Sequence, residues 1–243
     1  MVNKNGFNAF ELKIIAIIAM TLDHLSKIIP AYTTAGYVVL LLMNSLGRIT
    51  MPIMCFFVAE GFYHTRSLKK YLCRMFVFAI ISQIPFYLLT LKELPADVWE
   101  IINGNMTFNA IYTLFMGLLA LTIAKADRMN IIVKVILLPL VIMLTYRSDW
   151  HIYGVLWVLT FGLFRGDFKK QAIIFAIITI FRCVEIAVTE NLISVSVQIC
   201  TLLALPFLYQ YNGQQGKRLK YGFYIFYPAH MLVLGLINLF NIL

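Results

Sequence analysis

The chain has 243 residues, of which 61% are apolar and only 13% are charged, and its formal net charge is +9. Soluble domains carry about 25% charged residues, so this chain has too little polar surface to be covered by water. The composition excludes a soluble fold and predicts an all-α, polytopic integral membrane protein that forms a single domain over residues 1–243.

Apolar stretches of helix length recur along the whole chain. A helix needs about 20 mainly apolar residues to cross a bilayer core, because unpaired backbone groups are not tolerated in hydrocarbon. The first stretch lacks a small-residue cleavage site and is expected to remain as a helix. The sequence predicts about nine transmembrane helices, near residues 10–29, 37–63, 71–91, 109–125, 131–146, 151–164, 170–189, 191–209 and 222–242.

Basic residues are distributed unevenly between the two sides of these helices. The loops on one side hold only Lys27, Lys92 and Arg147. In membrane proteins the cytoplasmic loops collect Lys and Arg. We therefore expect a cytoplasmic N-terminus and an external C-terminus in a bacterial inner membrane. This asymmetry explains the net charge, so the expected contact is membrane lipid and no nucleic acid. Fifteen of the 20 basic residues fall on the predicted cytoplasmic side: Lys4, Lys13, Arg66, Lys69, Lys70, Arg74, Lys125, Arg128, Lys134, Arg165, Lys169, Lys170, Lys217, Arg218 and Lys220.

Asp23 and His24 stand near the outer end of the first predicted helix. Ionisable residues inside a membrane are costly and usually face a cavity, a partner or a substrate path. An imidazole can move a proton near neutral pH, and a neighbouring carboxylate can orient its ring. Adjacent helix residues point about 100° apart, however. Two alternatives therefore stay open. Asp23 pairs with Arg48 instead, or His24 is a buried structural histidine.

The second predicted helix contains Gly47, Arg48 and Pro52, and a proline inside a helix tends to kink or break it. Broken helices in membranes are tolerated where they line a cavity. Arg48 falls near the middle of the membrane and remains charged. It needs an anion, which is Asp23, Glu60 or a substrate.

Three cations, Arg66, Lys70 and Arg74, follow at spacings of four residues, which places them on one face of a helix. Such a face either holds the phosphates of a nucleotide-like donor or anchors the protein to lipid headgroups. Further along the chain, Arg182 and Glu185 are three residues apart and predict a structural ion pair.

Two further groups of polar residues fit either a structural or a functional role. The segment 147–154, with Asp149 and Tyr153, is typical of a membrane interface. His230 is either a donor-site residue or a structural one. The four cysteines show no metal-ligand spacing, so no metal site is expected.

The chain resembles the TraX family in segments that run through nearly its whole length. These are Leu12 to His24, Gly47-Arg48 to Pro52 with Glu60-Gly61-Phe62 and His64-Thr65-Arg66, Lys69-Lys70-Tyr71, Ser82 to Phe86, Asn109 with Thr113 and Gly117, Asp149 with Tyr153-Gly154, and Tyr227 to His230. The resemblance implies a membrane N-acetyltransferase that acts on the N-terminus of a pilin-like protein.

Lys13, ten residues and then His24 is similar to the basic-x10-His motif of the acyltransferase family 3 membrane enzymes. This resemblance implies that cytoplasmic acetyl-CoA is the donor and an outer-face protein, peptide or glycan is the acceptor. His24 becomes the catalytic base, oriented by Asp23, and Arg48 stabilises the oxyanion or holds an acidic residue. The implied acetyl-CoA contacts are Arg66, Lys70, Arg74 and His230, and the implied substrate-site residues are Lys13, Glu60, His64, Asn109, Asp149 and Tyr153.

Two other classes of protein also fit the sequence. A small proton-coupled transporter would use the same broken helices and mid-membrane charges. A non-catalytic assembly protein would use the charges only to hold its helices together.

Overall fold

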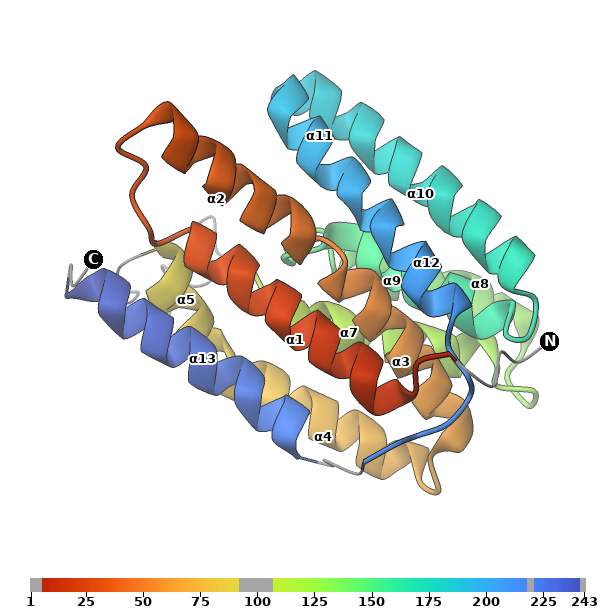
Figure 1. The fold of residues 1–243 in the computed structure, drawn as a ribbon. Coiled ribbons are helices and arrows are strands. Elements are labelled where there is room, and N and C mark those ends of the chain that lie inside the picture. Colours follow the sequence, from red (N-terminus) through yellow and green to blue (C-terminus); the bar gives the residue numbers. More distant parts are fainter. Residues whose placement is uncertain (1–5, 92–106, 218–220, 241–243) are drawn as a thin grey trace.

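A computed structural model describes residues 6–91, 107–217 and 221–240 of the protein. Within these ranges the regular structure is helical, and extended pairing is limited to two isolated bridges (Figure 1). The predicted all-α class is therefore confirmed for the described part of the chain. In chain order the helices are α1 (Ala9–Ser26), α2 (Thr34–Gly47), α3 (Thr50–His64), α4 (Leu68–Ile81), α5 (Gln83–Leu91), α7 (Ala110–Ala124), α8 (Ile131–Met143), α9 (His151–Leu163), α10 (Phe168–Thr189), α11 (Leu192–Ile199), the 3₁₀ helix η1 (Cys200–Leu203), α12 (Ala204–Tyr209) and α13 (Gly222–Leu239).

Each of the nine predicted stretches coincides with helix, although three of them are divided into shorter pieces. Helices α7, α8 and α9 are apolar but shorter than a full crossing, and nine crossings remain a prediction. Five helical segments are long and apolar enough to cross a membrane: Thr34–His64, Leu68–Thr90, Phe168–Thr189, Leu192–Tyr209 and Gly222–Leu239.

The connections gather at two opposite ends of the helices. Those between α3 and α4, α9 and α10, and α12 and α13 lie at the end where α1 begins, whereas the α1–α2 and α10–α11 connections lie at the other end (Figure 1). The first group carries basic residues assigned to the cytoplasmic side. Which end faces the cytoplasm remains a prediction, and Lys4, Lys92, Arg218 and Lys220 lie outside the described residues.

Side-chain caps fix where seven of the described helices begin, among them α1, α4 and α7. The Asn8 side chain accepts from the Glu11 backbone N–H, and Glu11 accepts in return from that of Asn8, which starts α1. The Ser67 hydroxyl caps α4 and the Asn109 side chain caps α7 in the same way. Because Ser67 is the cap, α4 begins only at Leu68 and Arg66 precedes it.

The predicted break in the second apolar stretch is confirmed, since α2 ends at Gly47 and α3 begins at Thr50. Pro52 lies in the first turn of α3, where a missing backbone N–H removes no helical hydrogen bond. A Cβ at Gly47 would collide with Cβ of Asp23, so glycine allows α2 to end directly against α1. The hydroxyl of Thr50 then donates to the carbonyl of Ala16 at 3.0 Å.

The largest buried cluster lies between α1, α3, α7 and α9, and includes Leu12, Ile53, Leu118, Trp157 and Phe161. A second cluster joins α5 and α13. These two helices approach closely, because a Cβ at Gly235 would lie 2.8 Å from Cβ of Leu88 and 3.0 Å from its backbone carbon. This contact fixes α13 beside α5.

Candidate functional site

A cavity of about 530 Å³ runs along α1 between α3 and α13. Its lining on α1 extends from Phe10 to Lys27, which corresponds to about 26 Å at 1.5 Å per residue. We call its two ends the basic end and the histidine end. The basic end is formed by Lys13, His64, Arg74 and Lys217, and the histidine end by Asp23, His24, Lys27, Arg48 and Asp149.

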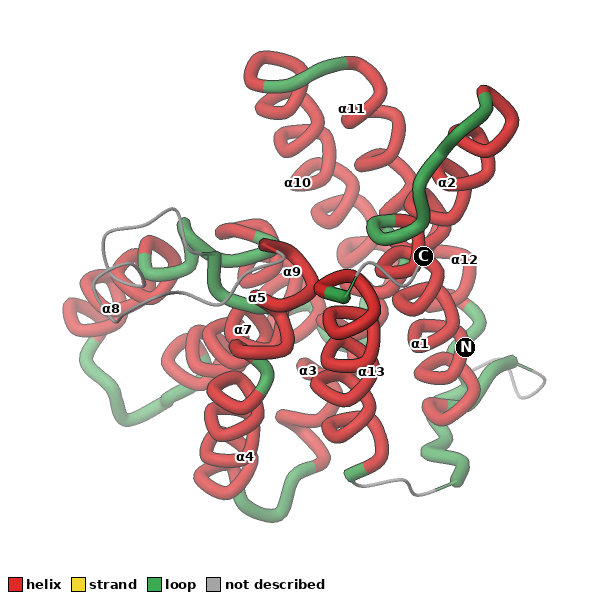
Figure 2. The backbone as a smooth tube through the Cα atoms, turned by 90° about the vertical axis from the view of Figure 1, so that its left-hand side faces the viewer, coloured by secondary structure: helices red, strands yellow, loops and turns green. Residues whose placement is uncertain are grey.

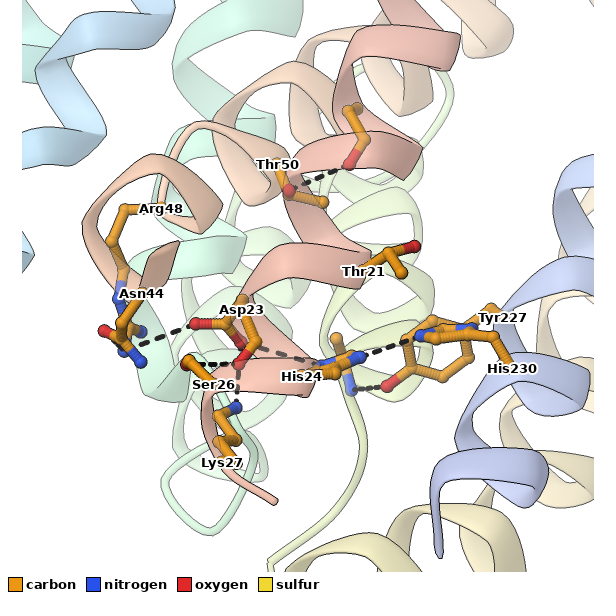
Figure 3. Close-up of polar contacts among 12 residues, drawn as sticks. Thr21, Asp23, His24, Ser26, Lys27, Asn44, Arg48, Thr50, Tyr227 and His230 are labelled. Carbon is orange, nitrogen blue, oxygen red and sulfur yellow. Dashed lines mark hydrogen bonds and ion pairs between the residues drawn. The ribbon is translucent and has the colours of Figure 1, made fainter. Parts of the chain in front are cut away.

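At the histidine end, two imidazoles from opposite ends of the chain meet. Nδ1 of His24 lies 2.8 Å from Nε2 of His230 (Figure 3). Nδ1 of His230 in turn lies 2.8 Å from the carbonyl of Phe226. A carbonyl only accepts, so Nδ1 of His230 carries the proton and its Nε2 accepts from Nδ1 of His24. These tautomers leave the lone pair of Nε2 on His24 free. The free lone pair is what a general base requires.

Asp23 lies within ion-pair distance of His24 but forms no hydrogen bond with it. Its Oδ2 lies 2.9 Å from Nζ of Lys27, but 3.7 Å from Nε2 of His24. The second separation exceeds hydrogen-bond distance. The reason is the rotation between adjacent helix residues, which turns Asp23 toward α2 and His24 toward α13. Lys27, one turn beyond Asp23, was missed although its spacing indicates the contact.

Arg48 caps the C-terminus of α2, and its anion is Asp23. The ion pair between them spans 3.9 Å, while Nη2 of Arg48 donates to Oδ1 of Asn44 at 3.0 Å. The guanidinium carbon also lies 5.5 Å from the centre of the Trp150 ring. The alternative in which Asp23 pairs with Arg48 is therefore confirmed.

Glu60 pairs elsewhere and does not line the cavity. Nε of Arg165 donates to its carboxylate at 2.7 Å, and Nε2 of His64 lies 3.3 Å away. The hydrogen bond that Arg165 donates to Glu60 raises the pKa of Arg165 above its usual range. Glu60 thus joins the ends of α3 and α9. Of Glu60 and His64, only His64 lines the cavity.

The basic end combines cations with aromatic rings. Nζ of Lys13 lies 4.8 Å from the centre of the Phe57 ring, and the Arg74 guanidinium lies 5.2 Å from that of Tyr71 and 5.3 Å from that of Tyr224. Nε of Arg74 is buried and has no hydrogen-bond partner among the described residues. Both carboxylates that line the cavity belong to the histidine end, so the charge at the basic end is positive.

The predicted basic face on α4 is only partly present. Arg66 lies before the helix, and neither Arg66 nor Lys70 lines the cavity, so Arg74 alone reaches it. Sequence reasoning also missed Lys217 as a lining residue, because it comes from the distant α12–α13 connection. His230, expected among the donor contacts, lies at the histidine end instead.

The remaining predicted residues divide between structural and cavity positions. Asn109 is fully buried and donates to the carbonyl of Ala79 at 2.7 Å, so it holds α7 against α4. Tyr153 packs 5.4 Å from Arg182, whose predicted pair with Glu185 is confirmed at 2.7 Å. Asp149, in the α8–α9 connection, does line the cavity. The protein around its carboxyl raises the pKa of Asp149 by excluding solvent.

Comparisons with known proteins agree with this architecture. Residues 9–238 match the family described as TraX protein. The chain is 34% identical over 235 residues to the probable fimbrial assembly protein FimC, serogroup H1, of Dichelobacter nodosus, covering 94% of each chain. It is also 35% identical over 82 residues to an uncharacterised protein of Rickettsia prowazekii (strain Madrid E), covering 34% of this chain and 28% of that protein. No solved structure matches the chain. The apolar helices and the match over nearly the whole chain identify a multi-pass membrane protein that belongs to the TraX family.

Proposed function

We propose that this protein is a membrane acetyltransferase that moves an acetyl group from cytoplasmic acetyl-CoA to the N-terminal amine of a pilin-like protein. The observation that carries the proposal is a single cavity that joins an uncompensated basic end to a histidine with a free Nε2. The fimbrial assembly name of the relative supports a pilin-like acceptor.

In this proposal the basic end binds the phosphates of acetyl-CoA. Lys13, Arg74 and Lys217 supply positive charge, and the orphaned Nε of Arg74 supplies a donor that a phosphate oxygen would satisfy. The rings of Phe223 and Tyr224 offer stacking surfaces for the adenine. The apolar cavity wall along α1 suits the long, thin pantetheine arm, which carries the thioester toward His24.

The reaction uses His24 as a general base. An unprotonated acceptor amine attacks the thioester carbonyl carbon and forms the C–N bond, while Nε2 of His24 accepts the amine proton. The carbonyl electrons move onto oxygen, and the positive charges of Lys27 and Arg48 stabilise this oxyanion. Collapse restores the C=O bond and breaks the C–S bond, and the CoA thiolate takes the proton from His24.

His230 has a positioning role in this mechanism. Its Nε2 accepts from Nδ1–H of His24, which holds the ring in the tautomer that leaves Nε2 of His24 free. The same contact stabilises the imidazolium that forms during the reaction. Because Nδ1 of His230 donates to the Phe226 carbonyl, His230 is itself fixed by α13.

The direct test is acetyl transfer by purified protein in detergent, with radiolabelled acetyl-CoA and apolar peptides that have a free N-terminus. Label should enter these peptides and should not enter the same peptides with a blocked N-terminus. Absence of label with every acceptor class, including glycans, would refute the proposal. Substrate-driven proton movement in proteoliposomes without transfer would favour the transporter instead, which the cavity's charged ends also fit.

A further inference from the structure

A second cavity, of about 310 Å³, lies between α2, α10 and α11. We call it the lateral cavity. Figure 2 shows the α10–α11 pair diverging from α2 toward the end that holds the α10–α11 connection. The polar side chains that line the cavity are Asn44, Arg48, Arg182, Glu190, Ser194 and Gln198.

The lateral cavity contains hydrogen-bond donors that lack partners. Gln198 is only 6% exposed, and its Nε2 has no hydrogen-bond partner among the described residues. Nε of Arg48 is likewise buried and unpartnered there. A buried donor without an acceptor is costly, so this arrangement indicates a site that a ligand completes.

The donors define the chemical class of that ligand. Arg48 and Arg182 provide guanidinium groups, each of which already pairs with one carboxylate, that of Asp23 or Glu185. Gln198 provides an amide N–H, and Glu190 is the only acid among the lining residues. A planar guanidinium matches the two oxygens of a carboxylate, and an amide N–H can donate to either oxygen. The groups that line the lateral cavity therefore suit a carboxylate.

The position of the lateral cavity connects it to the reaction. Arg48 lines both cavities and forms an ion pair with Asp23, the neighbour of His24. The helices that line the cavity also expose apolar side chains, with Leu42 of α2 58% exposed and Leu192 of α11 80% exposed. An occupant that carries an anionic group together with apolar side chains matches both features.

We propose that the lateral cavity is the acceptor subsite, and that it binds a carboxylate side chain of an apolar acceptor polypeptide whose amine reaches His24. The assignment of the occupant as acceptor rests on the proposed function. The carboxylate site itself rests only on the donors of the cavity, so binding and transfer can be tested separately.

The test measures binding of synthetic peptides to the full-length protein in detergent. The peptides are apolar Leu/Ala helices with a free N-terminus, in which a single Glu is moved through the first eight positions, and each has a Gln counterpart. At the best position the Glu peptide should bind at least about tenfold more tightly than its Gln counterpart, as expected for a charged hydrogen bond.

Variants of the lining residues should change this preference in opposite directions. Arg182→Gln and Gln198→Leu should remove most of the preference for Glu, and Glu190→Gln should increase it by removing a like charge. Lys170→Gln is the matched control, because Lys170 pairs with Asp167 three residues away on the far end of α10. It should leave the preference unchanged.

Equal binding of the Glu and Gln peptides at every position would overturn the proposal. It would also fall if Gln198→Leu weakened binding of phosphatidylglycerol in nanodiscs but not of the Glu peptide, because the cavity would then hold a lipid headgroup. A Glu preference without acetyl transfer would keep the carboxylate site and refute the proposed function.

Discussion

The two ends of the main cavity differ in how their charges are compensated. At the histidine end, Lys27 and Arg48 flank the carboxylate of Asp23. At the basic end, Lys13 and Arg74 lie over aromatic rings, and no carboxylate lines that part of the cavity within the described residues. Aromatic faces stabilise cations without neutralising them. The basic end therefore keeps positive charge for an anionic ligand, whereas the histidine end suits proton transfer.

The strongest test of this comparison is His24→Ala, which removes the proposed base. Acetyl transfer should fall about 10²- to 10⁴-fold, the usual contribution of general base catalysis. The KM for acetyl-CoA should hardly change, because the basic end remains intact. Unchanged transfer by a variant that extracts and unfolds like the natural protein would show that His24 is structural.

Replacement of His230 should have a smaller effect, and its size should depend on whether the new side chain can accept the hydrogen bond from His24. His230→Leu leaves Nδ1 of His24 without an acceptor and should lower kcat about ten- to a hundredfold, as a lost hydrogen bond to a charged group does. His230→Gln retains an amide oxygen and should recover part of this loss. Equal activity of the two variants would contradict the positioning role.

At the basic end, Arg74→Gln should raise the KM for acetyl-CoA about tenfold, because a charged phosphate contact is lost. The KM for the acceptor should not change. Arg66→Gln and Lys70→Gln are matched controls, since both residues share the sequence spacing but lie outside the cavity lining. Equal effects of all three changes would restore the basic face predicted from the sequence.

The smallest expected effect concerns the contact that places Asp23. Gly47→Ala introduces a methyl group against Asp23 and should lower stability by about 1–3 kcal/mol, the usual cost of overpacking. The control is Gly36→Ala on the same helix, whose Cβ would come no closer than 3.3 Å to the side chain of Thr33. Thermal unfolding in detergent measures both, and equal midpoints would show that α1 and α2 separate without cost.

The sequence by itself determined the class of the protein and the positions of its helices. Apolar length and composition placed helix at each predicted stretch, because these properties act through local backbone and solvent effects. Local spacing also identified the Arg182–Glu185 pair, and Gly47 and Pro52 indicated the break in the second stretch. The similarity to the basic-x10-His motif of the acyltransferase family 3 enzymes singled out His24.

Only the tertiary structure decided the partners of the site residues. His24 and His230 are 206 positions apart, and Lys217 reaches the basic end from a distant connection. These contacts depend on the rotation of each helix about its axis and on how closely helices approach, as Gly47 and Gly235 permit. Helical periodicity gives the spacing of residues along one helix but not its rotation against another. This is why the sequence left open whether Asp23 pairs with His24 or with Arg48, and why it grouped Arg66 with Arg74.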